Sequence, residues 1–218
     1  MKRIMLAVAF VASFSMALGF AMRRHPQGSE AQHGQFDYYV LSLSWAPNYC
    51  AEHTKNHSSE CSIGQRANFV LHGLWPQASA GDSPARCGPA SPVSHPIVRH
   101  MLDYYPSRGL IQHEWREHGV CTGLSAGDYF DQVEQAFNSL AIPDQYLSLG
   151  HSESFDVHEI EQNFARANNA PPGAFRVSCH AGEMINLQAC LSKDLRYQTC
   201  TASVRECRLS RVLMRQVQ

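Results

Sequence analysis

The chain has 218 residues, of which 44% are hydrophobic and 17% are charged. This length and composition suit one domain with a hydrophobic core. Its 18 lysines and arginines and 19 aspartates and glutamates give a formal net charge of −1, which excludes the broad basic surface that duplex-binding proteins present to phosphates. Twelve histidines would gain positive charge below a pH of about 6.5, so we expect an acidic working pH.

The start of the chain has the pattern of an export signal. A basic pair precedes an apolar run from Ile4 to Phe20, and small residues near the end of the run offer cleavage sites. We expect residues 1–21 to be a signal peptide, residues 22–35 a flexible lead-in and residues 36–218 the folded domain. A secreted or periplasmic location follows. Uncleaved, the apolar run would also reach the length of about 17 to 25 residues that a membrane anchor needs.

Two strands are expected at the start of the domain, with helices after them. The segments Asp37–Trp45 and Asn68–Leu74 are rich in aromatic and aliphatic residues, and Pro47 ends the first strand. The segment between them, Asn48–Gln65, is expected to be a polar loop. Farther along, apolar residues recur at helical spacing. This spacing predicts three helices, over Pro96–Tyr105, Ile111–His118 and Tyr129–Leu140.

The second half of the chain returns from helices to strands. Gly119 is expected to end a helix in a left-handed conformation, and a capping box at Asp156 and Glu159 starts a further helix that runs to about Ala167. Short β-like stretches follow at Phe175–Cys179, Met184–Leu191 and Tyr197–Ala202. Strands, then helices, then strands predict an α+β domain with a central, mainly antiparallel sheet and several helices.

Eight cysteines, at positions 50, 61, 87, 121, 179, 190, 200 and 207, are expected to staple this domain. An even number of cysteines in an exported chain indicates disulfides. No two of them form a Cys-x-x-Cys pair, which argues against a zinc module and against a thioredoxin-like redox site. The sequence alone does not choose among the many possible pairings.

Two short segments carry the chemistry of the chain: Phe-Val-Leu-His-Gly-Leu-Trp-Pro-Gln at 69–77 and His-Glu-Trp-Arg-Glu-His-Gly-Val-Cys at 113–121. Imidazoles can move protons near neutral pH without a metal. His72 is expected at the point where a strand ends and a loop begins, a common position for catalytic residues. On a helix, Glu114 and His118 share a face, so the carboxylate can orient that ring and favour its protonated form.

Each residue also has an ordinary structural explanation. A lone histidine such as His72 is more often a core residue bonded to backbone, and Glu114 with His118 could be a solvated ion pair, although the nearby tryptophans make a solvated face less favourable. A zinc protease needs His-Glu-x-x-His on one helical face. His113 and His118 are five residues apart and do not project together. We therefore expect no metal and no other cofactor.

Both segments resemble the active-site segments of the ribonuclease T2 family, which are secreted acid ribonucleases. The first matches the family's strand running into His-Gly-Leu-Trp-Pro, and the second matches His-Glu-Trp-x-Lys-His-Gly-x-Cys at all fixed positions but one. The segment Asp37–Trp45 and the cysteine layout are also similar, so the resemblance spans about residues 35–208. It implies four disulfides: Cys50–Cys61, Cys87–Cys121, Cys179–Cys207 and Cys190–Cys200.

The resemblance implies an endoribonuclease that cleaves single-stranded RNA by transesterification, with low base specificity. The 2′-hydroxyl attacks its own phosphorus, the 5′-oxygen leaves and a 2′,3′-cyclic phosphate forms, so DNA is not a substrate. His118 would be the base and His72 the acid. His113 would bind phosphate, and Glu114 would stabilise the pentacoordinate centre or the charged state of a neighbouring histidine.

The resemblance also implies how RNA is held. Trp75 would stack on a base, and the amide of Gln77 would read a base edge. RNA would be the partner of a monomeric protein, with no stable protein partner.

The departure from the family is Glu117, because many members carry a lysine there that is thought to stabilise the phosphorane charge. Arg116 is adjacent, but one residue along a helix rotates a side chain by about 100°, so it does not simply replace that lysine. We hypothesise that Glu117 keeps His113 protonated. The alternative function is a non-enzymatic secreted protein that kept the fold and lost turnover.

Overall fold

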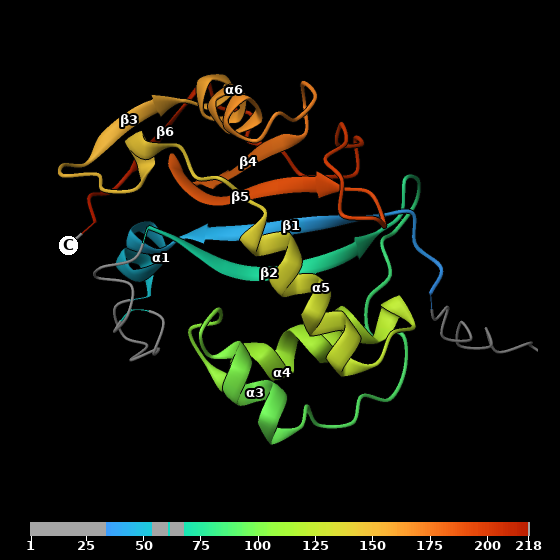
Figure 1. Ribbon diagram of the computed structural model, residues 1–218. Coiled ribbons are helices and arrows are strands. Elements are labelled where there is room, and N and C mark those ends of the chain that lie inside the picture. The colour runs from blue at the N-terminus through green and yellow to red at the C-terminus, as the bar shows by residue number, and fades with distance from the viewer. Residues whose placement is uncertain (1–33, 54–60, 62–67, 218) are drawn as a thin grey trace, which may run out of the picture. The chain divides into compact units, whose positions relative to one another are not determined.

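A computed structural model describes residues 34–53, 61 and 68–217 (Figure 1). The expected signal peptide and residues 22–33 of the expected lead-in lie outside the described residues. The strands are β1 Tyr38–Trp45, β2 Phe69–Gln77, β3 Glu153–Asp156, β4 Phe175–His180, β5 Glu183–Leu191 and β6 Arg211–Met214. The α-helices are α1 Ala46–Glu52, α3 His95–Met101, α4 Arg108–Glu117, α5 Ala126–Asn138 and α6 Val157–Ala167. Two short 3-10 helices cover Gly119–Thr122 and Asp144–Tyr146.

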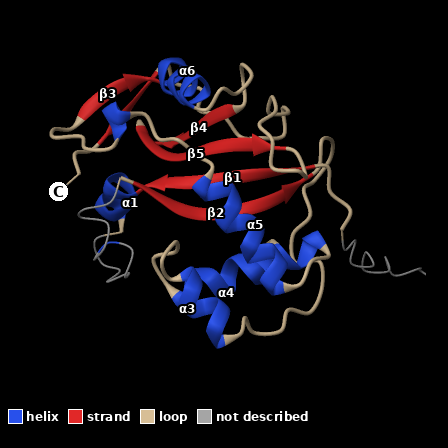
Figure 2. Cartoon of the chain, in the orientation of Figure 1, coloured by secondary structure: helices blue, strands red, loops and turns tan. Residues whose placement is uncertain are grey.

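The six strands form one sheet in the order β2-β1-β5-β6-β3, with β4 paired to β5. Every pairing is antiparallel except that of β5 with β6. Helices α4 and α5 lie beside β2, α3 packs against α4 and α5, and α6 lies against β3 and β4 (Figure 2). This confirms the expected α+β fold with a central, mainly antiparallel sheet. Within the described part of the chain, no helix is long and apolar enough to cross a membrane.

The local signals located most elements, and the differences have simple causes. The expected loop after the first strand begins as helix α1. Pro47 lies in its first turn, where a backbone N–H has no partner within the helix, so the missing N–H of proline removes no hydrogen bond. Strands β3 and β6 were not predicted because each has only four residues. The expected strand Tyr197–Ala202 contributes one isolated bridge, between Tyr197 and Leu191.

The expected cap at Asp156 is confirmed, but the left-handed cap at Gly119 is wrong. The Asp156 side chain caps α6 by accepting a hydrogen bond from the Glu159 amide at 3.0 Å. Helix α4 ends at Glu117, and Gly119 begins the following 3-10 helix, which is capped by left-handed Gly123. Gly119 is needed for space instead, because a Cβ there would lie 2.4 Å from the Trp115 ring.

Strand β1 is buried along its whole length and divides its side chains between two faces of the sheet. Its odd-numbered residues enter the main core with the helices. On the other face, a small apolar cluster consists of Tyr38, Val40, Cys190, Cys200 and Val204. Trp75 of β2 packs against this cluster. Trp75, in the functional segment 69–77, therefore lies on the face of the sheet opposite the main core.

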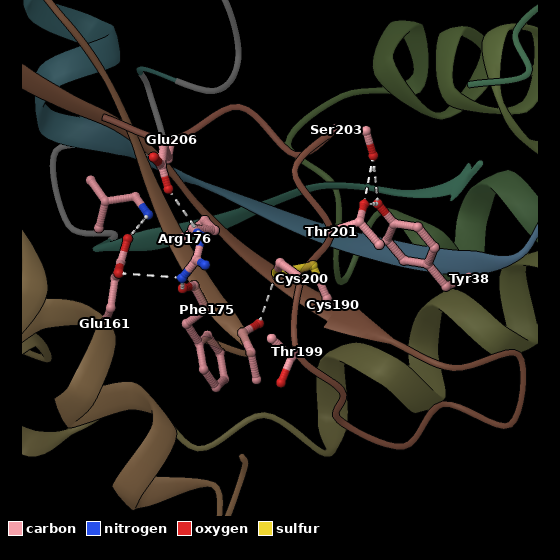
Figure 3. Close-up of a disulfide and its surroundings, with 12 residues drawn as sticks. Tyr38, Glu161, Phe175, Arg176, Cys190, Thr199, Cys200, Thr201, Ser203 and Glu206 are labelled. Atoms are coloured by element: carbon pink, nitrogen blue, oxygen red, sulfur yellow. Dashed lines mark hydrogen bonds and ion pairs between the residues drawn. A yellow bond between two sulfur atoms is a disulfide. The ribbon is translucent and has the colours of Figure 1, made fainter. Parts of the chain in front are cut away.

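Four disulfides join Cys50–Cys61, Cys87–Cys121, Cys179–Cys207 and Cys190–Cys200, which are the pairs that the resemblance implies. Cys190–Cys200 ties the loop after β5 back to the sheet, and the Tyr38 hydroxyl bonds the Thr201 and Ser203 hydroxyls of that loop (Figure 3). This disulfide and these bonds hold the small cluster beneath Trp75.

Candidate active site

A β-bulge in β2 sets the direction of the His72 side chain. Ser42 of β1 pairs with Gly73 and Leu43 pairs with Leu71, so His72 is an extra residue that the strand register pairs with no residue of β1. It therefore lies inside the strand, not at the end of a strand as expected. In a regular strand, residues 72 and 75 would point to opposite faces. The bulge turns His72 to the face of Trp75, and the two rings meet edge to face with centroids 5.2 Å apart.

Glu114 lies buried over the bulge, with its carboxylate between Trp75 and His72. Trp75 Nε1 donates to Glu114 Oε2 at 2.7 Å, and His72 Nε2 lies 3.8 Å from Oε1. Oε1 is buried and accepts no hydrogen bond from the described residues. Burial raises the pKa of Glu114 to about 8, and the charge of Glu117 adds to this effect. At acidic and neutral pH the Glu114 carboxyl is therefore protonated.

The expected side-chain pair of Glu114 with His118 is wrong, since His118 lies past the helix end. His118 caps α4 with φ −125° and ψ −50°, and only its backbone N–H bonds Glu114, through the carbonyl. Its ring lies against Trp75, with centroids 5.3 Å apart. Nδ1 is buried without a hydrogen bond in the described part of the chain, so Nε2 is the nitrogen available to a substrate.

Burial sets the protonation of the two imidazoles. It lowers the pKa of His118 to about 4, and His113 and His72 lower it further. Burial also lowers the pKa of His72 below its ordinary value of 6.5, as does His113. Both rings are therefore largely neutral at neutral pH, and His113 is close enough to influence each of them.

His113 is exposed on α4 at the rim of this cluster. Its Nδ1 lies 3.4 Å from Arg116 Nη2. Glu117 is only 8% exposed, and its carboxylate forms ion pairs with Arg86 and with Arg116, the latter at 3.2 Å from Nε. Arg86 lowers the pKa of Glu117 most, and Arg116 and His113 lower it further. The hydrogen-bonded partners of Glu117 are thus two arginines, and His113 acts on Glu117 through its charge alone. That Glu117 keeps His113 protonated stays a prediction.

The structure thus brings together His72, Trp75, Glu114 and His118, with His113 at the rim. Gln77 stands apart at the end of β2, where its amide oxygen accepts from Ser83 at 2.8 Å and its amide nitrogen donates to the Pro76 carbonyl. Sequence reasoning missed Arg86, Ser44 and Asn186. The alternation of serines in the first strand could have indicated Ser44, but no local signal indicates the others.

Replacing Gly73 by alanine should damage the site with little effect elsewhere. A Cβ there would lie 2.0 Å from Glu114 Oε2 and 2.5 Å from Trp75 Nε1, so the hydrogen bond between them must break. We expect a loss of about 1 to 3 kcal/mol in the free energy of unfolding, measured by urea titration, and loss of the Trp75–Glu114 contact, measured by indole N–H NMR. Gly109→Ala in α4 is the control, because only Ser107 Oγ lies near, at 3.8 Å. Unchanged stability and indole resonance in Gly73→Ala would contradict this geometry.

The sequence model of the Ribonuclease T2 family matches residues 36–204. The chain belongs to the ribonuclease T2 family. Among its relatives, a protein named "Ribonuclease" from Aeromonas hydrophila is 40% identical over 101 residues, which are 46% of this chain and 45% of that protein. A "Probable ribonuclease" from Haemophilus influenzae is 34% identical over 140 residues, which are 58% of this chain and 51% of that protein. The matched region spans about half the length of these two relatives.

The fold of this ribonuclease T2 family member is also similar to a solved structure, the RNase-related protein from Calystegia sepium. The TM-score is 0.69 at 21% identity, and the match covers 85% of this chain and 100% of that one. At this identity the similarity concerns the fold.

Proposed function

We propose that this chain is an endoribonuclease that cleaves single-stranded RNA by transesterification through a 2′,3′-cyclic phosphate, with low base specificity and without a metal or other cofactor. The observation that carries the proposal is the contact of two imidazoles, those of His72 and His118, with one tryptophan ring beside a buried carboxyl. Two such rings can serve as acid and base on opposite sides of a phosphate.

In this proposal His118 takes the proton of the 2′-hydroxyl and His72 protonates the leaving 5′-oxygen. The low pKa of His118 keeps it unprotonated and ready to act as a base in mild acid. Glu114 carries a proton under the same conditions, and its unpartnered Oε1 can donate it in a hydrogen bond to a phosphate oxygen. This favours stabilisation of the pentacoordinate centre over stabilisation of a charged histidine.

Trp75 has two proposed roles. Its ring packs against both imidazoles and its N–H holds Glu114, so it supports the catalytic groups. It is only partly buried, and we retain the proposal that its open side stacks on a base. Gln77 would read a base edge only after breaking its bond with Ser83.

The positive charge for phosphate binding is proposed to come from Arg116 together with His113. Glu117 stands where many family members have a lysine, but its ion pairs hold the guanidinium groups of Arg86 and Arg116 at the rim of the site. The cluster of Arg86, Arg116 and Glu117 keeps a net positive charge, and Arg116 contacts the exposed ring of His113.

Replacing Arg116 by glutamine should raise the KM for RNA about tenfold, because a hydrogen bond to a charged group is worth about 1.5 to 3 kcal/mol. It should also weaken inhibition by inorganic phosphate. Steady-state kinetics at several salt concentrations provide both measurements. Arg108→Gln, at the exposed start of the same helix, is the matched control. If KM and phosphate inhibition are the same in Arg116→Gln as in the parent, Arg116 does not bind phosphate.

The proposed function is tested with RNA and DNA of matched sequence, incubated at acidic to neutral pH in excess chelator. We expect cleavage of RNA alone, with 2′,3′-cyclic phosphate ends detected by mass spectrometry. Cleavage of DNA, or cleavage that the chelator stops, would refute the mechanism. If the RNA stays uncleaved at every pH tested, the result would favour the non-enzymatic alternative.

We further propose that the protein acts outside the cytoplasm as a monomer, with residues 1–21 as a signal peptide and residues 36–218 as the ribonuclease domain. The four disulfides support this location, because such bonds persist in oxidising compartments. The mature N-terminus, read by mass spectrometry, distinguishes a cleaved signal from an uncleaved anchor.

A further inference from the structure

One ring nitrogen of His72 faces two side chains that neither functional segment contains. Ser44 of β1 and Asn186 of β5 are directly paired across the sheet. The Ser44 hydroxyl donates to Asn186 Oδ1 at 2.9 Å and lies 3.3 Å from His72 Nδ1. Ser44 is only 5% exposed, so bulk water does not replace these contacts.

Counting hydrogens fixes the direction of the second contact. A serine hydroxyl has one hydrogen, and Ser44 donates it to Asn186. The Ser44 oxygen can therefore only accept from His72 Nδ1. The hydrogen bond at one ring nitrogen decides which nitrogen of a neutral imidazole is protonated. In the neutral ring the hydrogen then lies on Nδ1, and the lone pair lies on Nε2.

We propose that Ser44 and Asn186 are positioning residues that keep a hydrogen on His72 Nδ1, so that the proton transferred in catalysis always leaves from Nε2. The kinetic part of this inference rests on the proposed function. Nε2 is the nitrogen that faces Glu114 Oε1 in the site. As the P–O5′ bond breaks, its electron pair stays on the 5′-oxygen, which takes the Nε2 proton and leaves a neutral ring with Nδ1–H.

Asn186 also acts on the charge of the His72 ring. A hydrogen bond with Asn186 raises the pKa of His72, against the larger lowering by burial. An amide oxygen facing the ring has this effect because it stabilises the charged imidazole, whereas an amide NH2 group would have the opposite effect. Asn186 thus also helps His72 to hold the proton that an acid needs.

The tautomer is measured by ¹⁵N NMR of the full protein labelled at histidine, at a pH above 6.5, where the His72 ring is neutral. His72→Ala assigns the resonances. We expect Nδ1 to have the shift of a protonated nitrogen and Nε2 that of an unprotonated one. In Asn186→Ala the Ser44 hydroxyl loses its acceptor and can donate to the ring, so the hydrogen should move to Nε2.

Kinetics provide the second measurement. Ser44→Ala should lower kcat about tenfold, a part of the roughly 10² to 10⁴ that an acid contributes, and should leave KM unchanged because Ser44 is buried. Ser44→Thr keeps the hydroxyl and should restore most of the activity. Ser42→Ala is the matched control, because Ser42 is a fully buried serine two residues away on the same strand whose hydroxyl has no partner in the described part of the chain.

A neutral His72 ring with its hydrogen on Nε2 in the unaltered protein would overturn the inference, whether or not the protein cleaves RNA. Equal losses of kcat in Ser44→Ala and Ser42→Ala would also overturn it, since a general packing defect would then explain both. A protein with Nδ1–H on His72 but no activity on RNA would support the inference and refute the proposed function.

Discussion

Replacing His118 or His72 by alanine is expected to reduce kcat for RNA cleavage by about 10² to 10⁴-fold, the usual contribution of one acid or base. The two losses should not add, because each step needs both groups. His158→Ala is the control, since His158 is exposed on α6 and bonds only Gln162 among the described residues. Initial rates on a defined RNA measure the effect. Full activity in His118→Ala would remove His118 from the mechanism.

The same residues predict an acid optimum. The base must be unprotonated, so kcat/KM should rise as pH increases through about 4, the pKa of His118. The acid must be protonated, so kcat/KM should fall as pH rises through the pKa of His72, which burial places below 6.5. The profile of kcat/KM reports these groups in the free protein. An optimum above neutral pH would contradict the assignment of acid and base.

Replacing Glu114 by glutamine is expected to stabilise the fold at neutral pH. Burial raises the folded pKa of Glu114 to about 8 from an ordinary value of 4.5. Its contribution to stability is therefore complete below 4.5 and is lost as pH rises towards 8, because the unfolded chain releases a proton that the folded protein retains. At about 1.4 kcal/mol per pKa unit, glutamine should gain about 3 kcal/mol at pH 7. Its oxygen can still accept from Trp75.

Urea unfolding in acid and at neutral pH measures this gain, which should vanish in acid. Glu117→Gln is the matched control on the same helix, with the opposite sign. Arginine pairing lowers the pKa of Glu117, so its contribution is present above 4.5 and is lost as pH falls. That variant should be less stable than the parent at neutral pH. If Glu114→Gln were less stable than the parent at neutral pH, the surroundings of Glu114 would stabilise its charged form. That result would contradict the raised pKa of Glu114.

Much of this protein could be predicted from local pattern. The helix cap at Asp156, the apolar spacing of α5 and the aromatic and aliphatic run of β1 depend on residues a few positions apart, so short-range geometry determines them. The two functional segments could be recognised by their resemblance to the family's segments, since each is a continuous run. The order of the predicted elements indicated the fold class, and the resemblance to the family indicated the candidate acid, base and carboxyl: His72, His118 and Glu114.

The tertiary structure decided how those groups meet. A one-residue register shift at His72, invisible in the sequence, turns that ring towards Trp75. Glu114 then bonds Trp75, 39 positions away, rather than the histidine one helical turn along. Likewise, Glu117 pairs with an arginine 31 positions away, and Ser44 bonds Asn186 across 142 positions. Such contacts depend on strand register and on which buried carboxyl finds a partner, so packing of the whole domain sets them.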